Sequence, residues 1–160
     1  MQTKSFFPLG LAEEEAVIVG TAESSVWQTH YSAAKLVDGL GLDGSWPSNG
    51  CAHTEQNGNE WFSFELRVPQ KITRVNIVNR DASCERGRNI RITIGPSKGY
   101  DPNEPLCLPE IPQLVCGGGF QDFWCTGLHV GKFVKISRAG NMNLCEVEIF
   151  SSLRPVYSGK

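Results

Sequence analysis

The sequence predicts an all-β fold, an antiparallel jelly-roll β-sandwich formed by a single domain. Three observations predict it: short segments in which apolar and polar residues alternate, turn-forming residues between these segments, and very little helical periodicity. Several short strands separated by turns are typical of sandwiches and jelly rolls. The chain has 160 residues, of which 40% are hydrophobic and 20% charged, as expected for one globular domain with one core.

The strand predictions depend on alternation with a period of two residues, which places every second side chain on the buried face of a sheet. The predicted strands are residues 62–68, 75–77, 90–94, 133–136 and 145–150. Segments rich in glycine, proline and asparagine separate them and are predicted to be loops, at 39–50, 95–105, 117–119 and 139–143. One short segment, 32–37, is predicted to form a helical turn.

The sequence shows no internal repeat, low-complexity tract or linker, so a single domain covering 1–160 is predicted. Its core is expected at about 17–150, with short extensions at both ends. The first dozen residues resemble a signal peptide poorly, which favours a mature domain with an added start methionine; a trimmed leader is the alternative.

Charge and motif content argue against several classes of function. The net charge of −2 and a pI near 5.9 do not predict nucleic-acid binding, which usually requires a basic surface. No apolar run is long enough to predict a membrane-spanning helix. His30, His53 and His129 lie outside any His-Glu-x-x-His motif, and neither a Gly-x-Ser-x-Gly motif nor a phosphate-binding loop occurs. We therefore do not expect an enzyme.

Six cysteines occur, an even number, and none belongs to a Cys-x-x-Cys pair. This pattern favours disulfides over a zinc site and predicts a secreted or extracellular protein, because disulfides persist in oxidising compartments. A cytosolic protein with six buried thiols is the alternative.

Two polar segments, 49–55 and 79–86, stand where predicted strands begin or end. They contain His53, Arg80, Asp81 and Arg86. Arginines offer a rigid fork of N–H donors that can bind neighbouring sugar oxygens, and a histidine nitrogen can donate or accept a further hydrogen bond. Without further context, His53 would more often be a structural residue, and the arginines could be surface ion-pair partners of Asp81 and Glu85.

These residues resemble the motif of the F-type lectin, or fucolectin, family, which is related to the discoidin domains and the C-type domains of coagulation factors 5 and 8. The family motif is a histidine, 26 residues, an arginine, one residue, an aspartate, four residues and a basic residue. Here His53 is followed by 26 residues and Arg80, and Asp81 by four residues and Arg86, so only the single spacer is missing. Further matches in the same order are Leu36-Val-Asp38-Gly39, Glu60-Trp61-Phe62, Phe123-Trp-Cys125 and Leu144-Cys145-Glu146-Val147-Glu148.

The resemblance implies a calcium-stabilised lectin whose partners are fucosylated glycans or glycoproteins. His53, Arg80 and Arg86 would bind terminal L-fucose, and Asp81 would orient the arginines. The apolar wall for the methyl group of fucose would come from Trp46, or from Trp27 or His30. The family's two adjacent cysteines are replaced by Ala82 and Ser83, so the surface beneath the sugar is expected to differ, and a domain that keeps the fold without binding fucose is an alternative.

The resemblance also implies a structural calcium ion and specific disulfides. The calcium ligands would be the residues Lys35, Asp38, Leu40, Gly50, Cys145 and Glu146. Gly50 lacks the side-chain oxygen of the family's serine, and Ser48 or Asn49 could replace it. Cys51 would pair with Cys145 and Cys107 with Cys125; Cys84 and Cys116 would then bridge each other, or one would be a free thiol.

The predicted function is non-covalent glycan recognition in adhesion or cell recognition. One shallow sugar pocket binds weakly, so multivalency, including a homo-oligomer, would supply the avidity. Two rival functions are a discoidin-like adhesion or phospholipid-binding module that has lost fucose binding, and an enzyme or its carbohydrate-binding appendage.

Overall fold

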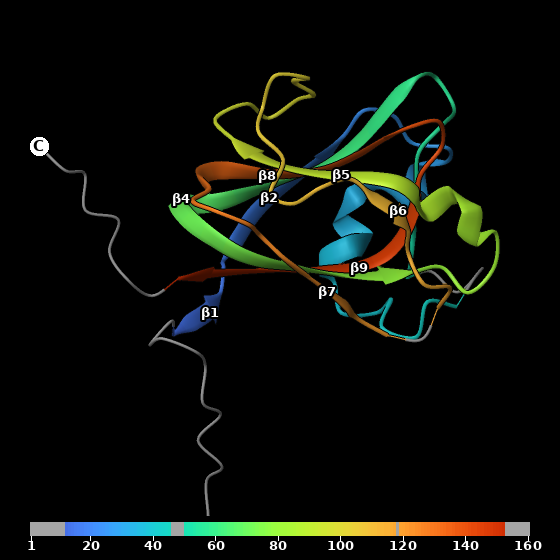
Figure 1. Cartoon of the computed structure of the whole chain (residues 1–160). Helices are drawn as coiled ribbons and strands as arrows, with labels where there is room; N and C mark the ends of the chain where they lie inside the picture. The colour runs from blue at the N-terminus through green and yellow to red at the C-terminus, as the bar shows by residue number, and fades with distance from the viewer. Residues whose placement is uncertain (1–11, 46–49, 118, 153–160) are drawn as a thin grey trace, which may run out of the picture.

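A computed structural model describes residues 12–45, 50–117 and 119–152. In this part of the chain the strands form one antiparallel sheet that curls over, so that its two halves face each other across the core (Figure 1). The predicted antiparallel β-sandwich is confirmed.

The strands are β1 (Glu13–Glu15), β2 (Ile18–Glu23), β3 (Ala52–His53), β4 (Asn59–Asn79), β5 (Arg88–Gly95), β6 (Ile111–Gln113), β7 (Gln121–Trp124), β8 (Val130–Ala139) and β9 (Asn143–Ser152). Among the described residues, three short 3-10 helices, η2 (Thr29–Tyr31), η3 (Ala33–Val37) and η4 (Cys84–Gly87), lie between the strands. The strand order is β1-β9-β4-β8-β5-β6, with β2 and β7 paired to β4 and β3 paired to β9. The helical turn predicted at 32–37 corresponds to η3.

Strand β4 corrects one sequence prediction. The segments 62–68 and 75–77 were expected to be separate strands, but they belong to one strand of 21 residues. Its first part pairs with β2 and β8 and its second part with β7 and β9, and the register with β8 shifts between Glu65 and Gln70. The bulge at this shift interrupts the period-two pattern and lets β4 pass from one half of the sheet to the other.

The core fills the space between the two halves of the sheet. Alternate residues of the long strands point into it, which is why the period-two segments predicted strands correctly. The fully buried side chains include Phe62, Phe64, Ile77, Ile90, Ile92, Ile136, Leu144 and Ile149, with Leu36 contributed by η3.

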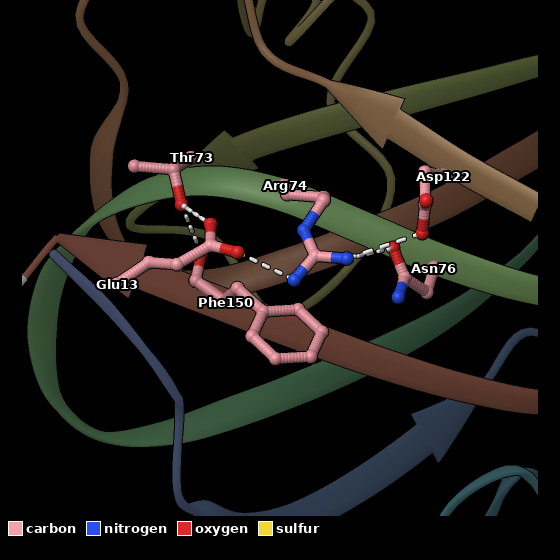
Figure 2. A network of polar contacts seen from close by, with 6 residues as sticks. All are labelled: Glu13, Thr73, Arg74, Asn76, Asp122 and Phe150. Carbon is pink, nitrogen blue, oxygen red and sulfur yellow. Dashed lines mark hydrogen bonds and ion pairs between the residues drawn. The ribbon is translucent and has the colours of Figure 1, made fainter. Parts of the chain in front are cut away.

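The strands that the sequence did not predict are β1, β2, β3, β6 and β7, most of which are only two to four residues long. Ionic and aromatic contacts hold β1 and β7 in place. Arg74 of β4 donates to Glu13 at 2.5 Å and to Asp122 at 3.1 Å, and its guanidinium lies 3.9 Å from the ring centroid of Phe150 (Figure 2). Glu13 is thus tied to the sheet, and Ala16, directly before the expected core of about 17–150, is buried.

A buried ion pair fixes the loop that follows β5. Lys135 of β8 contacts the carboxylate of Glu104 and donates a hydrogen bond of 2.9 Å to the carbonyl oxygen of Gly99. Both charged side chains are almost fully buried, so each compensates the charge of the other inside the domain.

All six cysteines form disulfides: Cys51 with Cys145, Cys84 with Cys116, and Cys107 with Cys125. The pairings implied by the resemblance are confirmed, and the open alternative for the third pair is decided in favour of a bridge. No helix in the described ranges is long and apolar enough to span a membrane.

The two ends of strand β9 define the two ends of the domain. Its last residue, Ser152, pairs with Glu13 of β1, so the described chain begins and ends on the same side. Its first residue, Asn143, pairs with His53 of β3 at the other end. The segment after β4 returns to this second end, because Asn79 pairs with Leu144.

Candidate functional site

The end of the sandwich near Asn143 carries a pocket of about 440 Å³. Its walls come from the loop after β2, from β3 and the loop that follows it, from the end of β4, from η4 and from the turn before β9. The lining residues are Trp27, His53, Thr54, Glu55, Gln56, Arg80, Arg86 and Asn141. His53, Arg80 and Arg86, predicted as site residues from the sequence, are therefore brought together in one cavity.

His53 is fixed at both ring nitrogens. Its Nδ1 lies 2.5 Å from the carbonyl oxygen of Thr54, and its Nε2 lies 2.8 Å from Nη1 of Arg86. A guanidinium only donates, so Nε2 accepts from Arg86 and Nδ1–H donates to Thr54, which assigns the neutral tautomer. Burial lowers the pKa of His53; the charges of Arg86 and Arg80 lower it further, against the opposing hydrogen bond to Thr54.

Arg80 follows the last residue of β4 and is only 8% exposed. Its Nη1 donates to Oδ1 of Asn143 at 2.8 Å, and Nδ2 of Asn143 donates to the carbonyl oxygen of Ala52 at 2.7 Å. This chain of hydrogen bonds holds the guanidinium against β3. Burial lowers the pKa of Arg80 and the neighbouring Arg86 lowers it further, but an arginine stays charged at any physiological pH.

Arg86 lies in η4, a helix that a disulfide holds. Cys84 of η4 is bonded to Cys116, and Ser83 before it has a positive φ of 54°, a left-handed conformation that is costly outside glycine and asparagine. Ala82 and Ser83 stand where the related family has adjacent cysteines, and here the bridge runs to a distant segment instead. The disulfide thus positions the turn that presents Arg86.

Trp27 provides the apolar wall of the pocket. Its ring lies 5.6 Å from that of Tyr31 and 5.2 Å from that of His53, and its side chain is 48% exposed. Of the other two predicted wall residues, His30 contacts Tyr31 at a ring distance of 4.0 Å and does not line the pocket. Trp46 lies outside the described residues.

Asp81, the predicted orienting carboxylate, is exposed and is not among the lining residues. Its backbone N–H donates to the carbonyl oxygen of Gly44 at 2.8 Å. Its charge favours the charged form of Arg80 and so acts on the pocket at short range.

The sequence did not predict as site residues the lining residues Thr54, Glu55, Gln56 and Asn141, nor Asn143, which holds Arg80. The turn before β9 and the loop after β3 form one wall because Thr54 N–H donates to the carbonyl oxygen of Met142 at 3.0 Å. A polar run directly after His53 was a usable signal for the first three. The two asparagines had no such signal in the sequence, because only the pairing of β3 with β9 brings them to the site.

A second group of predicted residues surrounds Gly41. A Cβ atom on Gly41 would lie 1.8 Å from the carbonyl oxygen of Cys145 and 2.3 Å from that of Gly50. A Cβ atom on Gly50 would lie 2.7 Å from the carbonyl oxygen of Leu40. The backbone oxygens of Cys145 and Gly50, two residues named by the resemblance, therefore meet at Gly41, where a side chain would not fit, and the backbone oxygen of Leu40 lies beside Gly50.

Glu146 and Asp38 add carboxylates to this loop. Glu146 is buried and accepts hydrogen bonds from the N–H groups of Gly39 at 3.0 Å and Gly41 at 3.4 Å. Burial raises the pKa of Glu146 to about 7, and the charges of Asp38 and Glu148 act in the same direction. Lys35, the remaining predicted ligand, lies in η3, which ends directly before Asp38.

This donor set fits a hard cation such as calcium, which takes six to eight oxygen ligands, many of them backbone carbonyls. Within the described ranges, no three His, Cys, Asp or Glu side chains are grouped to hold a metal, so such a site would depend on these backbone oxygens. The candidates Ser48 and Asn49 lie outside the described residues.

The sandwich and its pocket define the chain as a domain of the F-type lectin fold. The structure of a fucolectin from striped bass (Morone saxatilis) serum matches with a TM-score of 0.73 and 27% identity, over 85% of this chain and 46% of that one. A fucose-binding module of Streptococcus pneumoniae, SpX-3, matches with a TM-score of 0.64 and 26% identity, over 88% of this chain and 94% of that one.

The chain is a homologue of the fucolectins, and the resemblance predicted from its sequence is confirmed. It is 29% identical over 152 residues to the fucolectin of Anguilla anguilla, which covers 89% of this chain and 94% of that relative. It is also 26% identical over 140 residues to the pentraxin fusion protein of Xenopus laevis, covering 81% of this chain but 31% of that relative. No family model matches the chain.

The chain thus spans less than half of the striped bass lectin and about a third of the pentraxin fusion protein. An alginate lyase chain with a carbohydrate-binding module also matches, with a TM-score of 0.65 and 14% identity, and shows a shared fold only.

Proposed function

We propose that this protein is a lectin that binds terminal L-fucose in the pocket of His53, Arg80 and Arg86. The observation that carries the proposal is the meeting of these three side chains in one cavity, linked by the contact of 2.8 Å between His53 and Arg86. The names of the relatives, a fucolectin and a fucose-binding module, support the choice of sugar.

The pocket suits recognition without covalent chemistry. A guanidinium has five N–H donors, so Arg86 can hold His53 through one of them and direct others to the ring oxygen and hydroxyl groups of a sugar. Arg80, held by Asn143, adds a second set of donors from a fixed position. The exposed face of Trp27 offers an apolar surface for the C6 methyl group, the feature that separates fucose from ordinary hexoses.

Calorimetry with L-fucose and L-galactose tests this function. The two sugars differ only in a hydroxyl group at C6, so the apolar wall should favour fucose. We expect fucose to bind with a Kd of about millimolar or lower and L-galactose to bind several-fold more weakly. A flat titration with millimolar fucose on folded protein would sink the proposal. Equal affinity for both sugars would remove Trp27 from the methyl site.

Fucose binding should weaken as the pH falls. The neutral form of His53 accepts a hydrogen bond from Arg86, and protonation would place an imidazolium beside two guanidinium groups. The pKa of His53 lies below its ordinary value of 6.5, so the neutral form and its contribution to stability are fully present above pH 6.5. Both are lost as the pH falls through the lowered pKa of the folded protein. Affinity should therefore be constant from pH 7.5 to pH 6.5 and drop only at lower pH, where His53 gains a proton. Constant affinity over the whole acidic range in which the protein stays folded would contradict this role.

We also propose a structural calcium ion at the loop around Gly41. The carbonyl oxygens of Leu40, Gly50 and Cys145 and the carboxylates of Asp38 and Glu146 would hold it. The ion would neutralise the buried charge of Glu146 and join the 39–50 loop to β9. Cys145, whose carbonyl oxygen would bind the ion, also forms the disulfide with Cys51, so the ion and the disulfide would together support β3 and His53.

Three disulfides and the serum origin of one relative support secretion. The proposed role is the recognition of fucosylated glycans or glycoproteins in adhesion. Because a single small pocket gives modest affinity, we further propose that the protein acts in a multivalent form, as a homo-oligomer or as part of a longer chain.

A further inference from the structure

Four of the eight arginines of this acidic chain lie around the sugar pocket: Arg80, Arg86, Arg88 and Arg138. We call these four residues the arginine rim. Arg80 and Arg86 line the cavity and form the proposed fucose site. Arg88 and Arg138 have no role in that site, although each lies next to it.

Arg138 is locked into the rim by backbone acceptors. Its Nε donates to the carbonyl oxygen of Arg88 at 2.9 Å, and its Nη1 donates to the carbonyl oxygen of Asn141, which lines the pocket. Its guanidinium therefore bridges the start of β5 and the turn before β9. A side chain held in this way loses little further entropy when it binds a ligand.

Arg88 stands beside Arg138 and is exposed. Its Nε donates to Oε1 of Gln113 at 2.9 Å, which fixes its direction without neutralising its charge. Burial lowers the pKa of Arg138, and the charges of Arg88 and Arg86 contribute in the same direction, so these guanidinium groups repel one another.

Nearby carboxylates compensate the positive charge of the arginine rim only in part. In the described ranges no ion pair within 4.0 Å joins Arg86, Arg88 or Arg138 to a carboxylate, whereas Arg74, Lys132 and Lys135 all have one. The nearby acids are Glu55, Asp81 and Glu85. Glu85 acts on Arg80 and Arg138, Asp81 acts on Arg80, and Glu55 lines the cavity and accepts from Asn57.

We propose that Arg88 and Arg138 form a subsite for an anionic group, a sulfate ester or a carboxylate, on the sugar attached to the fucose. Arginine forks bind such planar or tetrahedral oxyanions through two N–H donors at once. The pocket volume of about 440 Å³ falls in the range of roughly 300–1,000 Å³ that holds ligands larger than one small ring. This subsite rests on the proposed fucose function. With it, the expected ligands are fucosylated glycans that carry a negative charge.

Glycan binding with matched ligands tests the subsite. The probes are a neutral fucosylated trisaccharide, the same trisaccharide with a sulfate on the sugar next to fucose, and its counterpart with a carboxylate there. We expect the native protein to bind at least one charged ligand about fivefold more tightly than the neutral one. This preference should shrink as salt rises, because the charges are partly exposed. The two charged probes separate sulfated glycans from those containing uronic or sialic acids.

Arg88→Gln and Arg138→Gln should abolish most of this preference while leaving the affinity for the neutral trisaccharide unchanged. Arg138→Lys, which keeps the charge, should retain part of it. Lys71→Gln is the matched control, since it also removes one positive charge. Lys71 lies in β4, nine residues before Arg80, which corresponds to about 30 Å of extended strand. This variant should retain the full preference, because that distance far exceeds the screening length of about 8 Å.

The outcomes separate the subsite from the fucose function. Equal binding of neutral and charged trisaccharides by the native protein would overturn the subsite and leave the fucose site intact. A preference that survives in both glutamine variants would also overturn it. Binding of none of the three ligands would overturn the fucose function and the subsite together. Binding of the charged ligands alone would support the subsite and show that fucose is not the main determinant.

Discussion

Replacing Arg80 with alanine is expected to weaken fucose binding by about a hundredfold or more, because two charge-assisted hydrogen bonds of roughly 1.5–3 kcal/mol each would be lost. Arg80 is almost fully buried and is aligned by Asn143, so no solvent-exposed side chain can replace it. Removing it also leaves Oδ1 of Asn143 without this donor. Calorimetry with L-fucose measures the loss.

Two control variants make the result specific. Arg80→Lys keeps the charge without the planar fork and should retain weak binding. Arg67→Ala, at an exposed position of β4 in the other half of the sheet, should bind fucose like the native protein. Circular dichroism and melting of each variant verify that the domain still folds. Native affinity in a folded Arg80→Ala protein would contradict the site. Binding to phospholipid vesicles that survives in Arg80→Ala would instead favour the discoidin-like alternative.

Removing calcium is expected to lower the melting temperature by roughly 5–10 °C. A ligand present at about 100 times its Kd stabilises the folded state by about 2.7 kcal/mol. For a domain of this size, 1 kcal/mol corresponds to about 2–4 °C. The physical cause is the buried carboxylate of Glu146, whose pKa is raised to about 7 because its charge lacks solvation. Melting with EDTA and then with excess calcium measures the effect and its reversal.

Asp38→Asn is the companion variant for this experiment. The asparagine can still accept the N–H of Leu40, as Asp38 does at 3.0 Å, but it brings no charge to the ion. We expect its melting temperature to respond less to calcium than that of the native protein. Magnesium should not replace calcium well, because it demands a smaller octahedral site and dehydrates reluctantly. An unchanged native melting temperature in EDTA would show that no structural ion is bound.

The long strands were predictable because their alternation is local. Phe62, Phe64 and Leu66 face the core, and the residues between them face the other side, a pattern that any short window of sequence contains. The length of β4 was not predictable, since a bulge between Glu65 and Gln70 interrupts the alternation. The shortest strands were missed for a related reason: the two residues of β3 show no period at all.

The residues of the candidate site also divide into those that the sequence predicted and those that it did not. His53, Arg80 and Arg86 were predicted from their match to the F-type lectin motif, which can be compared along the chain without a structure. Asn143 was not, although it aligns Arg80, because nothing near it in the sequence signals that β9 begins beside β3. The same pairing brings Asn141 and the backbone of Met142 to the pocket wall.

The sequence by itself determined the β-sandwich class, the resemblance to F-type lectins and the three basic residues of the pocket, because alternation, residue type and spacing are written along the chain. Only the tertiary structure decided how these residues are held: His53 neutral against Arg86, Arg80 aligned by Asn143, and Arg88 and Arg138 gathered beside them. The physical reason is that hydrogen-bond partners, burial and local charge depend on strand pairing across long separations, which no local pattern encodes.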